Sequence, residues 1–187
     1  MKRVLVIGSG GSGKSTLARL LGELLDVEVV HLDVEHWRPG WTEPSKEDWR
    51  RKVEELLRGD EWIIDGNYSG TLETRLAACD TVVFLDLPRA LCVWRALKRV
   101  VTYRKGRRPD MAEGCDEKFD LKFLKWIWDY PKRTRPKVLT LLEENARARS
   151  VYRLRSRAEV EGFLRGAKES GGVPREAEET GKFGGGR

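Results

Sequence analysis

Short apolar runs alternate along this chain with longer segments whose apolar residues recur every three or four positions. The short runs end at glycine, proline or charged residues and predict buried strands, at 4–8, 27–33, 61–65, 81–88 and 150–154. The longer segments predict amphipathic helices at 14–25, 45–58, 71–78, 89–103 and 117–130. After Pro131 and Pro136 a further helix is predicted to about residue 148, and a last short helix ends near residue 165. Strands that alternate with helices form a parallel sheet covered on both faces, so the pattern predicts an α/β fold.

The apolar pattern stops near residue 165, and the segment 166–187 is rich in glycine. Such a composition buries little apolar surface, so we expect one domain over 1–165 and a disordered tail over 166–187. No apolar run approaches the roughly 18 residues of a membrane-spanning helix, and the first apolar run is too short for a signal peptide. Cys79, Cys92 and Cys115 form no CxxC pair. This sparse set favours a reducing cytoplasmic location over a disulfide framework or a zinc site.

A glycine-rich loop joins the first predicted strand to the first predicted helix. Gly8-Ser9-Gly10-Gly11-Ser12-Gly13-Lys14-Ser15, followed by Thr16, matches G-x-x-x-x-G-K-[ST]. Glycines let successive N–H groups point at phosphate oxygens, and the helix N-terminus adds partial positive charge. We expect Lys14 to bridge the β- and γ-phosphates of ATP and the Ser15 hydroxyl to coordinate Mg²⁺. With a strand before it and a helix after it, this loop is better explained as a nucleotide site than as a chance flexible turn.

Three of the predicted strands end in aspartate, and ligands of open parallel sheets bind at the carboxyl ends of the strands. Asp65 follows the apolar run Trp62-Ile63-Ile64, which favours a carboxylate that holds Mg²⁺; the alternative is a simple Asp-Gly turn. Asp33 could orient an acceptor hydroxyl or accept its proton; the alternative is a polar strand end. Asp86 precedes Leu87-Pro88 and favours a structural role.

Arginines gather on the helix after the fourth strand and in the polar loop that follows it. Arginine forks stabilise the negative charge that phosphoryl transfer spreads over the transferred group, and a loop that closes over the site excludes water. The alternative for any one arginine is a solvated basic face. The candidates are Arg95, Arg99, Arg104, Arg107 and Arg108, with a lid at about 104–116.

These residues together resemble a known family. The glycine loop, "WIIDGNY", "TLETRL", "FLDLPR" and "RRPDMAEGCDEKFDLKFLKWIW" are similar to the bacterial DNA topology modulation proteins, which belong to the adenylate-kinase-like P-loop kinases. The resemblance covers about residues 2–165. It implies a P-loop NTPase three-layer fold, with a five-stranded parallel sheet in the order 2-3-1-4-5 and a helical lid after the fourth strand. In related kinases the adenine lies between a lid-helix arginine, here Arg95 or Arg99, and the loop after the fifth strand, here Ser156-Arg157.

The chain departs from true adenylate kinases at two places. Asp65-Gly66-Asn67-Tyr68 lacks the arginine that follows the third strand in those enzymes, and Ser15 stands where they have glycine. AMP is therefore a doubtful acceptor. The "HLD" of the second strand looks more like kinases that phosphorylate a hydroxyl group of a small metabolite, such as shikimate or gluconate kinases.

The sequence leads to a kinase hypothesis with open alternatives. In the first, the protein transfers a phosphoryl group from Mg-ATP to a small acceptor, a hydroxyl metabolite or a nucleotide. In the second, it is a nucleic-acid-binding regulator that uses ATP as a switch or not at all, since a net charge of +6 favours anionic partners of either kind. A third is ATP hydrolysis that drives a conformational change. The chain has no recognisable helix-turn-helix, zinc-finger or RNA-binding signature, which favours the first.

Overall fold

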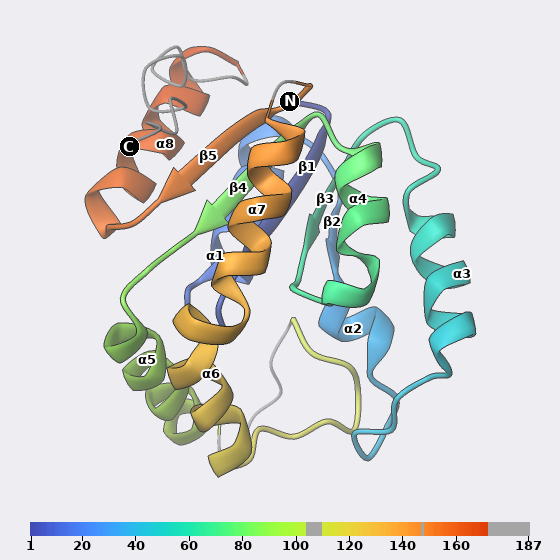
Figure 1. Ribbon diagram of the computed structural model, residues 1–187, viewed down its shortest axis with the longest axis vertical. Helices are drawn as coiled ribbons and strands as arrows, with labels where there is room; N and C mark the ends of the chain where they lie inside the picture. The colour runs from blue at the N-terminus through green and yellow to red at the C-terminus, as the bar shows by residue number, and fades with distance from the viewer. Residues whose placement is uncertain (104–109, 147, 172–187) are drawn as a thin grey trace.

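Five parallel strands form one sheet in the order β2-β3-β1-β4-β5 (Figure 1). The structure is a computed structural model that describes residues 1–103, 110–146 and 148–171. The central strand pairs with its neighbours so that Val6 lies opposite Asp65 and Val83. This order confirms the predicted α/β class and, with the glycine loop after the central strand, the P-loop NTPase fold. The strands are β1 (Arg3–Gly8), β2 (Val29–His31), β3 (Trp62–Asp65), β4 (Thr81–Leu85) and β5 (Ser150–Leu154).

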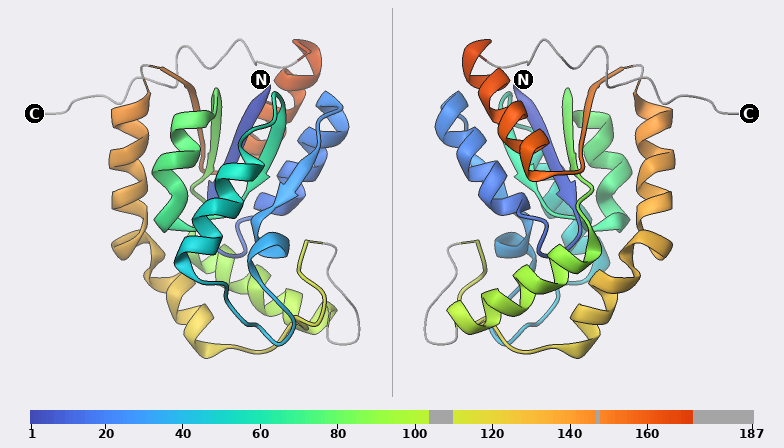
Figure 2. Two further views of the ribbon diagram at one scale, coloured as in Figure 1. Left: turned by 90° about the vertical axis from the view of Figure 1, so that its right-hand side faces the viewer. Right: turned by 90° about the vertical axis from the view of Figure 1, so that its left-hand side faces the viewer.

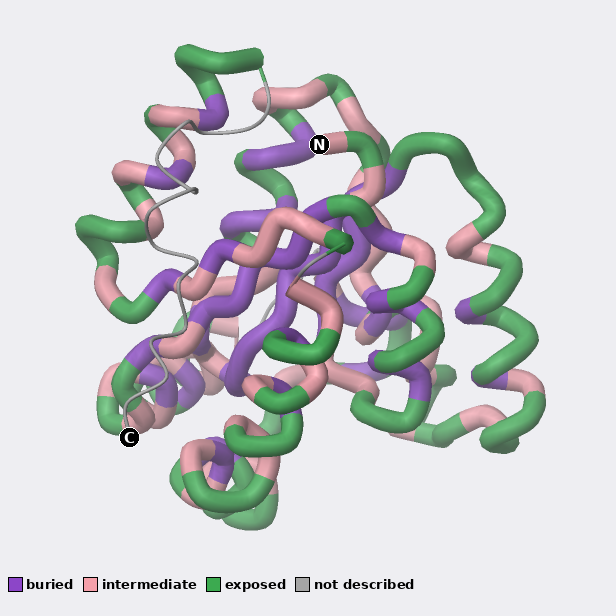
Figure 3. Tube along the Cα trace, turned by 45° about the horizontal axis from the view of Figure 1, so that its top comes forward, coloured by how far each residue is buried: buried purple, intermediate pink, exposed green. Residues whose placement is uncertain are grey.

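Helices cover both faces of the sheet and make it a three-layer sandwich (Figure 2). Helices α1 (Lys14–Leu25) and α8 (Arg157–Glu169) pack on the face that carries Val4 and Val6. Helices α3 (Lys46–Leu56), α4 (Leu72–Ala78) and α7 (Arg135–Asn145) pack on the face that carries Leu5 and Ile7. Because alternate residues of β1 point to opposite faces, one apolar run supplies both cores. The three central strands, β1, β3 and β4, are buried almost throughout (Figure 3).

The remaining helices lie at the carboxyl edge of the sheet, below it in Figure 1. They are α2 (Leu32–His36), α5 (Arg89–Thr102) and α6 (Leu121–Arg133), and a short 3₁₀ turn, η1 (Ser69–Thr71), precedes α4. Cys92 and Ala96 of α5 are buried against Ile127 of α6. The pair α5 and α6 thus forms a wall beside the end of β1.

Two predicted elements have different bounds. The second strand was predicted over 27–33, but β2 ends at His31 and α2 begins at Leu32. Leu32 is fully buried, and the acidic residues that follow it suit a helix N-terminus. The helix predicted over 117–130 instead spans Leu121–Arg133, because the Asp120 side chain accepts hydrogen bonds from the first N–H groups. Pro131 does not end it, since the buried Ile127 and Tyr130 hold the last turns against the core.

The end of the domain also lies later than predicted. Helix α8 continues to Glu169, and Ala167 is fully buried in the core, so the predicted tail boundary at residue 166 is wrong. The segment 172–187 and most of the predicted lid, 104–109, lie outside the described residues. Within the described ranges, no helix is long and apolar enough to cross a membrane.

Candidate active site

The glycine loop connects β1 to α1 at the carboxyl edge of the sheet. Gly11 and Gly13 have φ angles of 72° and 95°, which a side chain would strain. A Cβ atom at Gly11 would lie 2.2 Å from the Cys92 carbonyl oxygen of α5, so the loop and α5 are in direct backbone contact. The Gly8 N–H donates to the Asn67 side-chain oxygen at 3.0 Å. Gly13 caps α1 without a side-chain hydrogen bond, and the N–H groups of a first helical turn form a general anion site.

Lys14 folds back over this loop. Its Nζ donates to the Ser9 carbonyl oxygen at 3.1 Å. Desolvation lowers the pKa of Lys14, the charges of Asp65 and Asp33 act to raise it, and the charge of Arg99 lowers it. Three of the predicted residues, Asp33, Asp65 and Arg99, are therefore within electrostatic range of Lys14. The structure brings them to Lys14 of α1 from α2, β3 and α5.

Asp65 ends β3 beside the first turn of α1 and is only 4 % exposed. The Ser15 hydroxyl donates to one carboxylate oxygen at 2.8 Å, and His31 Nδ1 lies 2.5 Å from the other. Burial lowers the pKa of His31, but the hydrogen bond and charge of Asp65 outweigh it and raise the pKa. Because both carboxylate oxygens of Asp65 have side-chain partners, the geometry favours a site carboxylate over the simple Asp-Gly turn that the sequence left open.

The hydroxyl and carboxylate oxygens of Ser15 and Asp65 are the ligand types that Mg²⁺ prefers. In the described part of the chain, no cluster of three or more histidine, cysteine or acidic residues could hold a metal ion. In nucleotide sites Mg²⁺ is held by one or two protein oxygens together with phosphate and water. The residues present therefore fit the predicted magnesium role of Ser15 and Asp65.

Asp33 is the second residue of α2 rather than the end of a strand. The Tyr68 hydroxyl donates to Asp33 Oδ1 at 2.8 Å, and burial raises the pKa of Tyr68, which keeps the phenol a donor. The Tyr68 ring packs 4.5 Å from the ring of His36 and 5.0 Å from that of Trp49. Asp33 is thus a carboxylate oriented by a tyrosine, on the side of the site away from α5.

One buried arginine, which is not among the predicted site residues, stabilises this side of the site. Arg75 of α4 is fully buried. Its guanidinium donates to the carbonyl oxygens of Gly66, Asn67 and Tyr68 at 2.9–3.0 Å. Burial lowers the pKa of Arg75 to about 10, which leaves it charged at neutral pH. Arg75 thereby fixes the loop whose side chains hold Gly8 and Asp33.

The predicted arginines have different environments. Arg95 Nη1 donates to the Ser12 carbonyl oxygen of the loop at 3.1 Å, and Arg99 Nε donates to Glu117 at 2.6 Å. Arg157, predicted to contact adenine, has a mostly exposed side chain that pairs with Glu161 at 2.7 Å. Thr16 is exposed at the first turn of α1. Arg104, Arg107 and Arg108 lie outside the described residues, so their roles remain predictions.

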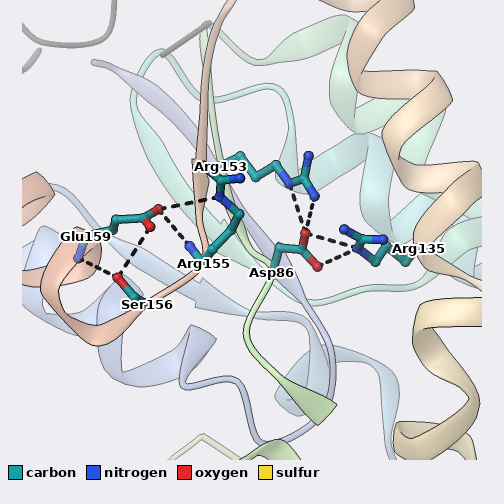
Figure 4. A network of polar contacts seen from close by, with 6 residues as sticks. All are labelled: Asp86, Arg135, Arg153, Arg155, Ser156 and Glu159. Carbon is teal, nitrogen blue, oxygen red and sulfur yellow. Dashed lines mark hydrogen bonds and ion pairs between the residues drawn. The ribbon is translucent and has the colours of Figure 1, made fainter. Parts of the chain in front are cut away.

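Asp86 has the structural role that the sequence favoured. Its buried carboxylate follows β4 and accepts hydrogen bonds from Arg135 of α7 and Arg153 of β5, at 2.7 Å and 2.6 Å (Figure 4). The Asp86 N–H also donates to the Leu154 carbonyl oxygen at 2.8 Å. The two ion pairs join the end of β4 to β5 and α7.

Three residues with contacts at the site were not singled out from the sequence. They are His31, Arg75 and Glu117. Two of them carried a signal. His31 precedes Asp33 at the carboxyl end of a strand, and Arg75 lies between Leu72 and Leu76 on the apolar stripe of its helix. Glu117 carried none, because it precedes α6 and its partner, Arg99 of α5, lies 18 residues away in the sequence.

Comparison with known proteins adds little to this geometry. No family model matches the chain, and no curated protein matches it by sequence. Among solved structures it is similar to shikimate kinase from Bacteroides thetaiotaomicron, with 17 % identity and a TM-score of 0.48 over 90 % of this chain and 97 % of that one. A likeness at this level does not bear on the reaction. The P-loop NTPase fold follows from the strand order and the loop geometry of this chain itself.

Proposed function

We propose that this protein is a P-loop kinase that transfers a phosphoryl group from Mg-ATP to a small-molecule acceptor. The observation that carries the proposal is the hydrogen bond between Ser15 and Asp65 beside Lys14, at the mouth of the glycine loop. A lysine, a hydroxyl and a carboxylate at the carboxyl end of adjacent strands are the parts that P-loop enzymes use to bind a triphosphate and its metal ion.

The loop amides and Lys14 bind the β- and γ-phosphates. Lys14 already lies over the loop and donates to the Ser9 carbonyl oxygen, so a phosphate oxygen would replace that acceptor. Desolvation strengthens the attraction between the ammonium group and phosphate, because fewer waters screen it. Ser15 and Asp65 would hold Mg²⁺, which would supply charge neutralisation at the phosphates.

Asp33 is the residue proposed to receive the acceptor. Tyr68 fixes one of its oxygens, and the other would accept the hydrogen bond of an acceptor hydroxyl. Phosphoryl transfer depends mainly on positioning and charge stabilisation, so orientation of the nucleophile is a sufficient role for this carboxylate. Arg95 and Arg99, on the opposite side of the loop, would stabilise the charge of the transferred group.

The resemblance to the DNA topology modulation proteins supports the kinase proposal through their membership of the adenylate-kinase-like kinases. Through the name of that family it also supports the alternative, a regulator that binds nucleic acid. The site favours the small acceptor, because Lys14, Arg95 and Arg99 gather around the phosphate-binding loop. Binding to nucleic acid by charge alone would be weak, independent of sequence and steeply reduced by salt.

An acceptor screen tests the proposal. ADP release from Mg-ATP is measured with wild-type protein in the presence of nucleosides, nucleoside monophosphates, sugars, amino alcohols and hydroxy acids, and with duplex DNA. We expect one small-molecule class to stimulate release, and Lys14→Ala to abolish the stimulation. Lys168→Ala, which removes an exposed lysine of α8, is the matched control and should behave as wild type. Sequence-selective DNA binding at near-physiological salt, with no stimulation by any acceptor, would replace the kinase proposal with the regulator.

A further inference from the structure

Arg99 lies on the face of α5 that looks toward the glycine loop. It is one helical turn beyond Arg95, which donates to Ser12 of that loop. The charge of Arg99 contributes to lowering the pKa of Lys14, although desolvation is the larger cause. Its guanidinium also lies 5.6 Å from the ring of Phe123 in α6, and this ring is packed against Gly10. Arg99 and the glycine loop therefore both pack against Phe123 of α6.

The carboxylate of Glu117 forms an ion pair with Arg99. Arg99 Nε donates to Glu117 Oε1 at 2.6 Å, and the two side chains are 23 % and 5 % exposed. An ion pair with so little solvent around it is stronger and more directional than a surface pair. A carboxylate this deeply buried has a desolvation cost that its pairing with arginine must offset.

The backbone around Glu117 is anchored at both ends. Before it, Met111, Ala112 and Cys115 are buried against Trp37 and Trp41, which follow α2.

Two hydrogen bonds hold the same contact, from the Gly40 N–H to the Gly114 carbonyl oxygen at 3.0 Å and from the Cys115 thiol to the Arg38 carbonyl oxygen at 3.2 Å. After Glu117, Asp120 caps α6. Glu117 is thus fixed in place between the turn on the acceptor side of the site and the helix wall on the phosphate side.

We propose that Glu117 is a positioning residue that holds the Arg99 guanidinium against the γ-phosphate side of the nucleotide site. This inference rests on the proposed function, because it requires a triphosphate in the loop. The Nε contact turns the guanidinium plane, and its fixed fork then presents the Nη groups in one direction. Preorganised charge of this kind stabilises phosphate without a reorganisation cost at the moment of reaction. Its contribution is to the third phosphate and not to the nucleotide as a whole.

The test compares affinities for Mg-ATP and Mg-ADP. Both are measured by calorimetry for wild type, Glu117→Ala, Glu117→Gln, Arg99→Ala and the double variant Arg99→Ala/Glu117→Ala. The near-isosteric Glu117→Gln guards against a loss of folding in Glu117→Ala, and thermal unfolding is recorded for each. Glu23→Ala, which removes an exposed carboxylate 3.7 Å from Arg19 on α1, is the matched control.

We expect Glu117→Ala to weaken Mg-ATP binding by about tenfold and Mg-ADP binding by less than about twofold, since an arginine–phosphate contact at one phosphate is lost. Arg99→Ala should have the same effect, and the double variant should be no weaker than Arg99→Ala, because Glu117 acts through Arg99.

Equal losses for ATP and ADP, no loss in either variant, or a loss in the double variant that adds to that of Arg99→Ala would overturn the positioning role. Failure of wild type to bind either nucleotide would instead remove the proposed function itself. The two failures are therefore distinguishable in one set of titrations.

Discussion

Replacement of Arg75 by methionine should destabilise the protein and loosen the loop 66–68, whose side chains contact Gly8 and Asp33. The methionine keeps an unbranched apolar side chain in the fully buried position between Leu72 and Leu76, so the change removes mainly the guanidinium. The backbone carbonyls of Gly66 and Asn67 lose their donor, whereas that of Tyr68 keeps the Thr71 N–H.

The expected loss follows from two opposing effects. Each buried carbonyl left without a partner costs about 1–3 kcal/mol. The substitution also relieves the burial of a charge, whose cost lowers the pKa of Arg75 to about 10 and offsets at most about 3 kcal/mol. Two orphaned carbonyls at about 2 kcal/mol each cost about 4 kcal/mol, and the relieved charge returns at most about 3, so we expect the free energy of unfolding to fall by about 1–4 kcal/mol.

Urea unfolding of wild type and Arg75→Met, followed by tryptophan fluorescence and circular dichroism together, measures this difference. Arg19→Met on the exposed face of α1 is the control and should change the free energy of unfolding by less than about 0.5 kcal/mol. If Arg75→Met lay within about 0.5 kcal/mol of wild type, the guanidinium would not be the brace of the 66–68 loop, and this reasoning would be refuted.

Three further predictions concern the loop, the carboxylates and pH. Asp65→Asn should raise the Mg²⁺ concentration needed for half-maximal activity, whereas Asp33→Asn should chiefly raise KM for the acceptor; equal shifts in both titrations would contradict the assigned roles. Gly11→Ala should lower the thermal unfolding midpoint and nucleotide affinity together, because its Cβ would lie 2.2 Å from the Cys92 carbonyl oxygen, and an unchanged midpoint would count against that backbone contact. Burial lowers the pKa of His36 in the folded protein, so the unfolded chain binds a proton there more readily. The neutral His36 therefore contributes its full stability above the pKa of the unfolded chain, and this stability is lost as pH falls through the lower pKa of the folded protein. Urea unfolding between about pH 7 and 5 should therefore show a steeper loss of stability in wild type than in His36→Gln, and parallel curves would argue against it.

The sheet and the glycine loop could be predicted because their signals are local. An apolar run such as Val4–Ile7 can be buried on both faces only in a parallel sheet with helices on each side, and G-x-x-x-x-G-K-S leaves few alternative structures. The position of Asp65 next to β1 depended on the strand order, and that came from the family resemblance rather than from the apolar pattern.

The interior of the site could not be predicted to the same depth, because its polar groups depend on partners far away in sequence. The apolar pattern predicts Asp33 at the end of a strand, but it lies in α2. The change from strand to helix after His31 is decided by the burial of Leu32 and not by local propensity. Glu117 and Arg99 meet only because the segment before α6 packs on the turn at Trp37 and Trp41. Periodicity within one element carries no information about such contacts.

The destination of the γ-phosphate tests the central claim most directly. Phosphorus NMR of wild type with Mg-ATP and a stimulating acceptor from the screen would follow every phosphate species in one tube. The account predicts that the γ-phosphate signal of ATP is replaced by the signal of a phosphorylated acceptor in equal amount to the ADP formed, and that Lys14→Ala forms neither. Release of the γ-phosphate only as inorganic phosphate, or turnover that survives in Lys14→Ala, would contradict a kinase that works through this loop.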